Sequence, residues 1–406
     1  MPEKLKIDSI AYRGDGVGRG ADGRVWFVPG VCDGETVLAE PLVTKKTFIR
    51  GKVAALCEPS PDRLETPECR AIPGCVYGHA SYEAELRWKR GQLLSFLGQA
   101  KIPDAPALLL DSFASPKRLH YRNKISLHYE APRKLGYVGD DNVSVTDIFE
   151  CPLAAPEINE ALAEYRRDPD FWSWVANEDG AVLRWTKNDG VVVTGQNSTR
   201  RGTGANARML TEHTSTLGDV LVPETGFYQV NNEVADALAE HAAKIAAAKN
   251  PSAILDLYCG VGVLGLAAAR MCGGNGIRVY GCDTGPDVIR AAKTNAKKTG
   301  SAGNAKFWCA KAKEMMGWLA NDGVDLSNAL TIVDPPRAGL EPEVLRALAD
   351  NPPGTLLYVS CAPDTLARDL RVLLESGRQQ VKSARLFDMF PRTAHFETCV
   401  ELIRTN

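Results

Sequence analysis

From Glu224 to the end of the chain, short apolar runs alternate with segments of helical periodicity. The apolar runs are "AILDLYC", "RVYGCD", "ALTIVDPPR" and "TLLYVSC", and helix-like stretches such as "PDVIRAAKTNAKK" and "EVLRALAD" lie between them. Buried strands that alternate with amphipathic helices are typical of a parallel sheet covered on both faces. We therefore predict an α/β, doubly wound, Rossmann-like domain at residues 223–406, with a ligand at the carboxyl edge of its sheet.

The sequence before residue 223 has a different pattern. Residues 1–58 contain short β-like runs separated by glycine, and their spacing predicts a small, OB-like β-barrel. The proline-rich stretch "CEPSPDRLETPECRAIPGC" indicates a linker or a metal-binding loop. It opens a predicted central domain, 59–222, whose further runs are mixed and sheet-rich. A chain of 406 residues is too long for one ordinary core, so three domains are expected.

Composition excludes several classes of protein. The 44% hydrophobic and 24% charged residues are typical of a soluble globular protein. The N-terminus has no apolar signal region, and the longest apolar stretch contains Asp256 and three glycines, so no membrane span is expected. Eleven cysteines without a signal favour reduced thiols in the cytoplasm, with catalytic or metal roles preferred over disulfides. With a net charge of −2, a polyanion would have to bind a local basic patch, and we expect a monomer.

The stretch "LDLYCGVGVLGLAAAR" places three glycines between a predicted strand and a predicted helix. Gly260, Gly262 and Gly265 allow a sharp turn and the close approach of a ligand to the backbone. Asp283 ends the next predicted strand, where its carboxylate can accept both hydroxyls of a ribose. The glycine spacing also fits the dinucleotide fingerprint, so it leaves both NAD and S-adenosyl-L-methionine open.

The motif "DPPR" favours one of these cofactors. Asp334 follows the apolar run "ALTIV" and precedes two prolines, which leave the backbone few alternative conformations. An Asp-Pro-Pro motif one sheet unit beyond a glycine-rich loop resembles the site of class I methyltransferases and favours S-adenosyl-L-methionine. In amino-group methylases the next residue is typically aromatic, whereas here it is Arg337, and Cys361 follows one strand later.

Cys361 lies between an apolar run and a helix-like segment. A lone cysteine there either fills a small apolar gap or acts as a nucleophile. Carbon 5 of uracil needs such a nucleophile, because thiolate addition at carbon 6 turns carbon 5 into a carbanion that can accept a methyl group. A separate base must then remove the carbon 5 proton. Glu397, among aromatic and apolar residues that raise its pKa, can supply this base, although a surface glutamate is the alternative.

Five motifs in this order, "GFYQVN", "LDLYCGVG", "DPPRAGL", "SCAPDTLARDL" and "FPRTAHFE", resemble the RNA 5-methyluridine (uracil-C5) methyltransferase family. Members of that family act on 23S rRNA or on the T-loop of tRNA. The resemblance runs from the N-terminal barrel, which is similar to a TRAM domain, to the last predicted strand. It implies that Cys361 is the nucleophile and Glu397 the base. The residues that it implies for cofactor contact are Gln229, Tyr258, Gly260, Asp283 and Asp334, and those that it implies for shaping the site are His395 and Arg368.

The cysteine loop departs from the family pattern. Many members hold a [4Fe–4S] cluster with four cysteines, and the resemblance assigns Cys69, Cys75 and Cys151 to three of these positions. Ile72 stands where another cysteine is expected, so the iron–sulfur set is incomplete. The thiols either hold a cluster with one open iron or pack as small hydrophobic groups. Lys311 is a second departure, because members usually carry an acidic residue near the adenine at that position.

A basic stretch from Ser115 to Gly139 indicates contact with RNA. It holds six Lys or Arg residues against one Glu, interleaved with tyrosines that could stack on bases. Arg122 matches a recurrent family position and is the best single candidate for an RNA contact. A barrel combined with a cysteine loop favours 23S rRNA over tRNA, because the simpler tRNA enzymes usually lack both. Two other functions stay open: an NAD-dependent oxidoreductase, and a catalytically inactive RNA-binding relative.

Overall fold

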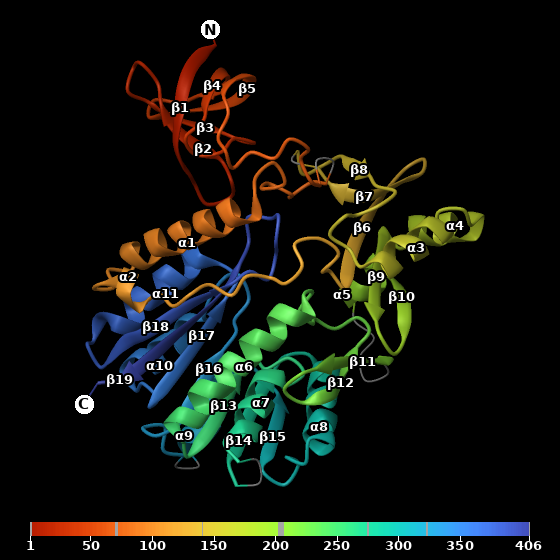
Figure 1. Ribbon diagram of the computed structural model, residues 1–406. Helices are drawn as coiled ribbons and strands as arrows, with labels where there is room; N and C mark the ends of the chain where they lie inside the picture. Colours follow the sequence, from red (N-terminus) through yellow and green to blue (C-terminus); the bar gives the residue numbers. More distant parts are fainter. Residues whose placement is uncertain are drawn as a thin grey trace.

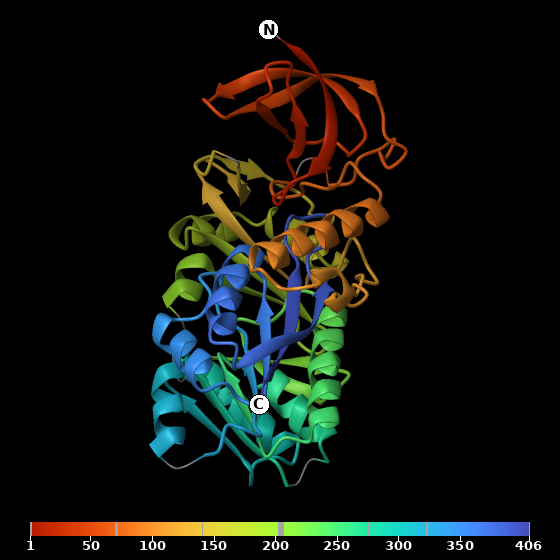
Figure 2. The same cartoon turned by 90° about the vertical axis from the view of Figure 1, so that its left-hand side faces the viewer.

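The computed structural model describes residues 2–69, 72–139, 141–201, 207–273, 276–321 and 324–405. Their strands form a closed barrel, a five-stranded sheet, a two-stranded hairpin and a seven-stranded sheet (Figure 1). The barrel stands at one end of the molecule, and a long helix, α1, lies between it and the seven-stranded sheet in both views (Figure 2). Among the described residues, no helix combines the length and the apolar character that crossing a bilayer requires.

The N-terminal strands close into the predicted barrel in the order β1-β2-β3-β5-β4. Side chains on alternate positions point inward, as Leu5 and Ile7 do on the first strand, and pack around the buried Trp26. The barrel thus has its own small core. Its strands are β1 (Glu3–Ile10), β2 (Gly16–Arg19), β3 (Val25–Val28), β4 (Thr36–Thr44) and β5 (Phe48–Glu58).

The central region is built on a sheet of order β10-β9-β6-β7-β8, followed by the hairpin β11–β12. Strand β9 is almost wholly buried, and two helices cover it and extend the same apolar cluster. The strands are β6 (Lys124–Glu130), β7 (Lys134–Val138), β8 (Val145–Asp147), β9 (Gly180–Thr186), β10 (Gly190–Gly195), β11 (Met209–Thr214) and β12 (Gly218–Pro223). The helices are α3 (Pro156–Tyr165), α4 (Pro169–Asn177) and α5 (Gln196–Arg201).

Helix α1 (Tyr82–Gln99) belongs to the C-terminal core, although it lies within the predicted central domain. Ser81 caps its first turn by accepting a hydrogen bond from the Ala84 backbone N–H at 3.2 Å. Leu93 and Leu97 pack in the same apolar cluster as the strands of the seven-stranded sheet. The short α2 (Ala105–Leu108) follows it. Ala105 of α2 packs in this cluster too, so the region 59–222 contributes both α1 and α2 to the C-terminal unit. The predicted domain boundaries stay predictions.

The C-terminal sheet has the order β15-β14-β13-β16-β17-β19-β18. Its first five strands are parallel, as predicted for a Rossmann-like domain, and the last two run antiparallel to their neighbours. Strand order reverses at β13 and β16, and ligands bind at such a switch point. The strands are β13 (Ala253–Leu257), β14 (Arg278–Asp283), β15 (Ala305–Cys309), β16 (Leu330–Val333), β17 (Thr355–Ser360), β18 (Gln379–Phe387) and β19 (Glu397–Arg404).

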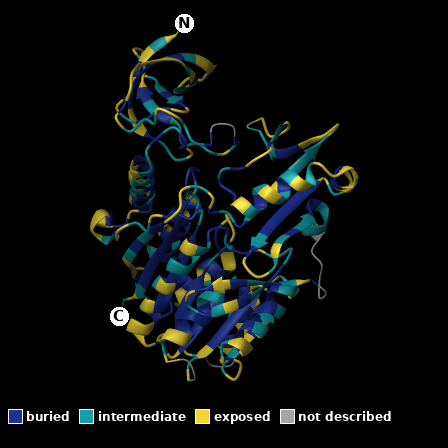
Figure 3. Cartoon of the chain, turned by 45° about the vertical axis from the view of Figure 1, so that its right-hand side comes forward, coloured by how far each residue is buried: buried dark blue, intermediate teal, exposed yellow. Residues whose placement is uncertain are grey.

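Helices cover both faces of this sheet and bury two separate apolar clusters. One cluster holds α9, α10, α11 and α1, and the other holds α6, α7 and α8. Figure 3 shows the sheet strands buried between the partly exposed helices. The helices are α6 (Asn232–Lys249), α7 (Val263–Met271), α8 (Pro286–Lys298), α9 (Ala312–Asn321), α10 (Pro342–Asp350) and α11 (Pro363–Glu375).

Candidate active site

The glycine-rich loop leaves β13 at the switch point and turns sharply into α7. Tyr258, Gly260 and Gly262 all have positive φ, at 65°, 52° and 85°. A Cβ added to Gly260 would meet no atom within 4 Å, so open space lies beside the loop backbone. Asp283 holds the loop, because its carboxylate accepts hydrogen bonds from the backbone N–H groups of Gly260 (3.1 Å) and Gly285 (3.0 Å). Each carboxylate oxygen keeps a lone pair that could accept from a ribose hydroxyl.

Asp256 was not predicted as a site residue, although it is the one charged residue in the apolar run "AILDLYC". Its Oδ2 accepts a hydrogen bond from the Gly265 N–H at 2.9 Å, and a Cβ on Gly265 would lie only 2.7 Å from that oxygen. Burial, and then Asp334 and Asp283, raise the pKa of Asp256 to about 7. A buried carboxyl without a charged partner inside a strand was the available sequence signal.

A pocket beside this loop collects the predicted cofactor residues. Gln229, Tyr258, Gly260 and Asp334 line it, and Asp283 adjoins it through its hydrogen bond to Gly260. Burial, and then Asp283, raise the pKa of Asp334 to about 7. Apolar lining, two carboxylates and an open loop backbone fit a nucleoside cofactor such as S-adenosyl-L-methionine.

Strand register brings Cys361 and Glu397 together. In the antiparallel pair of β17 and β19, Ser360 lies opposite Thr398. One residue farther on each strand, Cys361 therefore faces Glu397. The Glu397 side chain is 3% exposed, and its Oε2 has no hydrogen-bond partner among the described residues. Burial, and then Asp334, raise the pKa of Glu397 well above its ordinary value, while Arg337 lowers it.

The thiol of Cys361 is half-buried beside three charged groups. Burial, and then the Glu397 carboxylate, raise the pKa of Cys361 to about 11, and Asp334 adds to this effect. Arg337 opposes it through its positive charge and a hydrogen bond to the thiol. The sequence identified Arg337 only as a departure from amino-group methylases. Its contact with the thiol depends on how the loop after Pro336 folds back, and no spacing rule reveals this.

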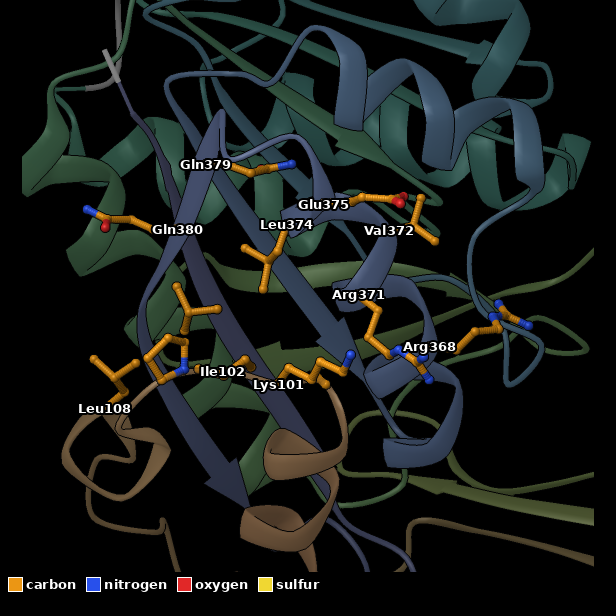
Figure 4. A pocket seen from close by; sticks show the side chains of 13 residues that line it. Lys101, Ile102, Leu108, Arg368, Arg371, Val372, Leu374, Glu375, Gln379 and Gln380 are labelled. Carbon is orange, nitrogen blue, oxygen red and sulfur yellow. The ribbon is translucent and has the colours of Figure 1, made fainter.

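His395 and Arg368 hold different positions around the site. Burial lowers the pKa of His395 to about 4, and the nearby cations Arg337, Lys89, Arg13 and Arg122 lower it further, so the imidazole is neutral. Arg368 lies on the outer side of α11 and donates a hydrogen bond to the carbonyl of Ala338 at 2.9 Å. Through this hydrogen bond it holds the loop that follows Asp334. It also borders a separate groove between α11, β18 and the end of α1 (Figure 4).

A buried charge network anchors the segment that leads to Glu397. Lys89 on α1 donates hydrogen bonds to Glu85 (2.6 Å), Asp388 (2.7 Å) and the carbonyl of Phe390 (3.2 Å). Glu85 also accepts from the backbone and guanidinium of Arg392 at 2.8 and 3.1 Å. The network therefore ties α1 to the chain between β18 and β19, five to nine residues before Glu397.

The three candidate iron–sulfur cysteines are neighbours but are already engaged with other protein groups. Cys75 and Cys69 share a hydrogen bond that lowers the pKa of Cys69, and Cys151 accepts one from the Tyr137 hydroxyl at 3.4 Å. In the described part of the chain, no group of three or more His, Cys, Asp or Glu residues is arranged to hold a metal ion. With Ile72 buried in the same apolar cluster, the residues present do not fit a four-cysteine cluster.

Arg122 lies between the cysteine loop and the active site. Its guanidinium interacts electrostatically with the phenols of Tyr121 and Tyr137 and with the thiols of Cys151 and Cys75. Its positive charge also lowers the pKa of His395. The two tyrosines are committed to the fold, since Tyr121 is buried and donates to the carbonyl of Pro391. They are therefore not free to stack on bases, and an RNA contact by Arg122 stays a prediction.

The sheet order, the glycine loop and the carboxylates together fit a Rossmann-like methyltransferase that uses S-adenosyl-L-methionine. The sequence model of the tRNA (uracil-5-)-methyltransferase family matches residues 220–405, the C-terminal part of the chain. This match favours methyl transfer over the function of an NAD-dependent oxidoreductase.

Similarity to known proteins extends over the whole length of the chain. It is 28% identical to an uncharacterized RNA methyltransferase of Halalkalibacterium halodurans, with 98% of this chain and 96% of that protein covered. A second uncharacterized RNA methyltransferase, from Thermotoga maritima, is 27% identical over 100% of this chain and 99% of its own length. The crystal structure of Pyrococcus abyssi tRNA (uracil-54, C5)-methyltransferase in complex with S-adenosyl-L-homocysteine has the same fold. Its TM-score is 0.73 at 24% identity, with 99% of each chain covered.

Proposed function

We propose that this protein methylates carbon 5 of a uridine in RNA, with S-adenosyl-L-methionine as the methyl donor. The observation that carries the proposal is the register of β17 and β19, in which a thiol faces a buried carboxyl beside the cofactor pocket. Within the described part of the chain, the Oε2 atom of that carboxyl has no hydrogen-bond partner. Gln229, Tyr258, Gly260, Asp283 and Asp334 would hold the cofactor. When bound there, the cofactor supplies an electrophilic methyl group.

Cys361 acts as the nucleophile. Its thiolate adds to carbon 6 of the uracil, and the electron pair of the 5,6 double bond moves to carbon 5, which then attacks the methyl group. Because burial holds the thiol pKa at about 11, formation of the thiolate needs assistance. Arg337 provides it, since its positive charge and hydrogen bond favour the ionised form.

Glu397 acts as the base in the second half of the reaction. After methyl transfer, carbon 5 carries both the methyl group and its original proton, and the Glu397 carboxylate removes that proton. The electron pair reforms the double bond and expels the Cys361 thiolate, and the enzyme returns to its starting state once Glu397 has released the proton to solvent. Burial suits this task, because a carboxyl with a raised pKa is a stronger base once it is ionised.

Two classes of RNA are candidates for the substrate. The cysteine loop and barrel favour 23S rRNA through the family resemblance. A tRNA is the second candidate, because the Pyrococcus abyssi protein that shares this fold is named for tRNA uracil-54. That protein matches over 99% of both chains, so a barrel of this kind does not by itself separate rRNA enzymes from tRNA enzymes.

We expect the purified protein to form 5-methyluridine in RNA from a strain that lacks its gene. Total RNA would be incubated with methyl-labelled cofactor, separated into rRNA and tRNA, digested and analysed by mass spectrometry. Label in 23S rRNA supports the first substrate and label in tRNA the second. Cofactor binding without labelled uridine in either fraction would instead support the catalytically inactive RNA-binding relative.

We expect anaerobically purified protein to be colourless and free of iron. Each candidate thiol already has a protein partner, and Ile72 occupies the position of the missing ligand. The measurements are iron content and the visible absorption spectrum, made before any exposure to air. Brown protein with about four irons per chain would contradict this expectation and restore the [4Fe–4S] cluster.

A further inference from the structure

The turn between the first two barrel strands is anchored against the C-terminal unit. It runs from Ala11 to Asp15, and Gln92 on α1 donates hydrogen bonds to the carbonyls of Ile10 (3.3 Å) and Ala11 (3.1 Å). A Cβ added to Gly14 would lie 2.8 Å from the Cβ of Val76, so the turn also fits closely against the cysteine loop. These contacts fix the position of the turn relative to α1 and the cysteine loop.

That position borders the proposed catalytic pair. The Tyr12 ring packs edge-on against Phe96 of α1 at 5.4 Å and against Phe396 at 6.3 Å between centroids. Phe396 immediately precedes Glu397. Burial raises the pKa of Tyr12, and Asp364 and Cys361 raise it further, which places the phenol within the electrostatic reach of the proposed nucleophile.

Arg13 occupies an unfavourable conformation at the tip of this turn. Its φ is 80°, and Gly14 N–H donates to the Ala11 carbonyl at 3.0 Å, so Arg13 holds the position of a type II turn that normally requires glycine. Its side chain is exposed, and among the described residues it forms no ion pair. Non-glycine residues with positive φ are costly, and they are retained most often at functional sites.

Arg13 is one of several cations whose positive charge acts on the active site. The positive charges of Arg337, Arg13 and Arg122 all act on the neutral imidazole of His395. Arg13 also borders a groove of about 750 Å³ that runs past Cys75 toward Gly139, between the barrel and the central sheet. An RNA strand that presents a uridine to Cys361 would thus bring its phosphates close to this guanidinium.

We infer that Arg13 binds a phosphate flanking the target uridine, so that the barrel completes the substrate site rather than only adding RNA affinity from a distance. This inference rests on the proposed RNA methylation. A guanidinium pairs well with a phosphate through two parallel hydrogen bonds. Tyr12 serves as a positioning residue, because its contacts with Phe96 and Phe396 fix the turn beside the catalytic pair.

The test compares Arg13→Ala, Arg13→Gly and wild-type protein. Both variants should lower kcat/KM for RNA by about ten- to a hundredfold, the loss of one charge-assisted contact. The slope of log affinity against log salt concentration should fall by about 0.7 to 0.9, as expected for one phosphate contact. Affinity for S-adenosyl-L-methionine should stay unchanged. Arg13→Gly should at the same time raise the unfolding temperature, because glycine relieves the positive φ.

Arg19→Ala is the matched control, since Arg19 is an exposed arginine on the adjoining barrel strand β2. It should change the kcat/KM for RNA much less than Arg13→Ala does. Equal losses at both positions, or wild-type kcat/KM and salt slope in both Arg13 variants, would overturn the inference. A wild-type protein that binds cofactor but methylates no uridine would instead overturn the proposed function, so the two failures are distinguishable.

Discussion

Replacing Cys361 with alanine is expected to abolish both methylation and the covalent protein–RNA complex, whereas replacing Glu397 with glutamine is expected to trap that complex. Attack at carbon 6 and methyl transfer precede the step that needs the base, so only the release step fails in the glutamine variant. Turnover should fall by about 10²–10⁴-fold, the usual cost of losing a general base. The trapped complex should migrate as a slow, denaturant-resistant band on a gel of labelled RNA.

Cys399→Ala is the matched control for this pair. Cys399 lies two residues beyond Glu397 on β19, is 1% exposed, and burial raises its pKa to about 12. It packs in the apolar core, so its alanine variant should keep near wild-type turnover and form no additional band. Normal turnover of the Glu397→Gln variant, or a covalent band from Cys361→Ala, would show that the roles are assigned to the wrong residues.

The sequence predicted the barrel and the doubly wound sheet because both depend on local patterns. Glycine-separated β runs and the alternation of apolar strands with helices are properties of neighbouring residues. The strands after Cys361 were harder to place, since an antiparallel β19 inserted between β17 and β18 depends on long-range pairing. It is this insertion that brings Glu397 opposite Cys361, a proximity that only the family resemblance had implied.

Most of the residues that the sequence missed share one property: their roles depend on contacts between distant segments. Tyr12 and Phe396 are 384 positions apart, and no periodicity links them. Arg337 becomes a thiol partner only after its loop folds back. Asp256 is different, because a charge inside an apolar strand is visible in the sequence and could have been singled out.

The buried network around Lys89 supports a second large effect, on stability. Its ammonium group is fully buried between Glu85 and Asp388, and its removal would leave two carboxylates without their shared counter-charge. Breaking a buried ion pair on one side typically costs about 3–5 kcal/mol. We therefore expect Lys89→Met to lower the free energy of unfolding by roughly that amount at pH 8, as measured by urea unfolding.

The pH dependence of this loss identifies its cause. Burial raises the pKa of Glu85 to about 6 even with Lys89 present, and the loss of Lys89 would raise it further. Because this folded-state pKa lies above the unfolded value, the folded variant binds a proton that the unfolded chain does not, and its stability recovers as the pH falls. The difference in the free energy of unfolding between the variant and wild type should thus be largest above pH 7 and shrink toward pH 5.

Lys244→Met is the control, because Lys244 forms the same i,i+4 pair with Glu240 on the exposed face of α6. This substitution should lower the free energy of unfolding by about 0.5 kcal/mol or less at either pH. A loss for Lys89→Met that is equally small, or that does not change with pH, would mean that the buried carboxylates do not depend on Lys89 for their charge balance.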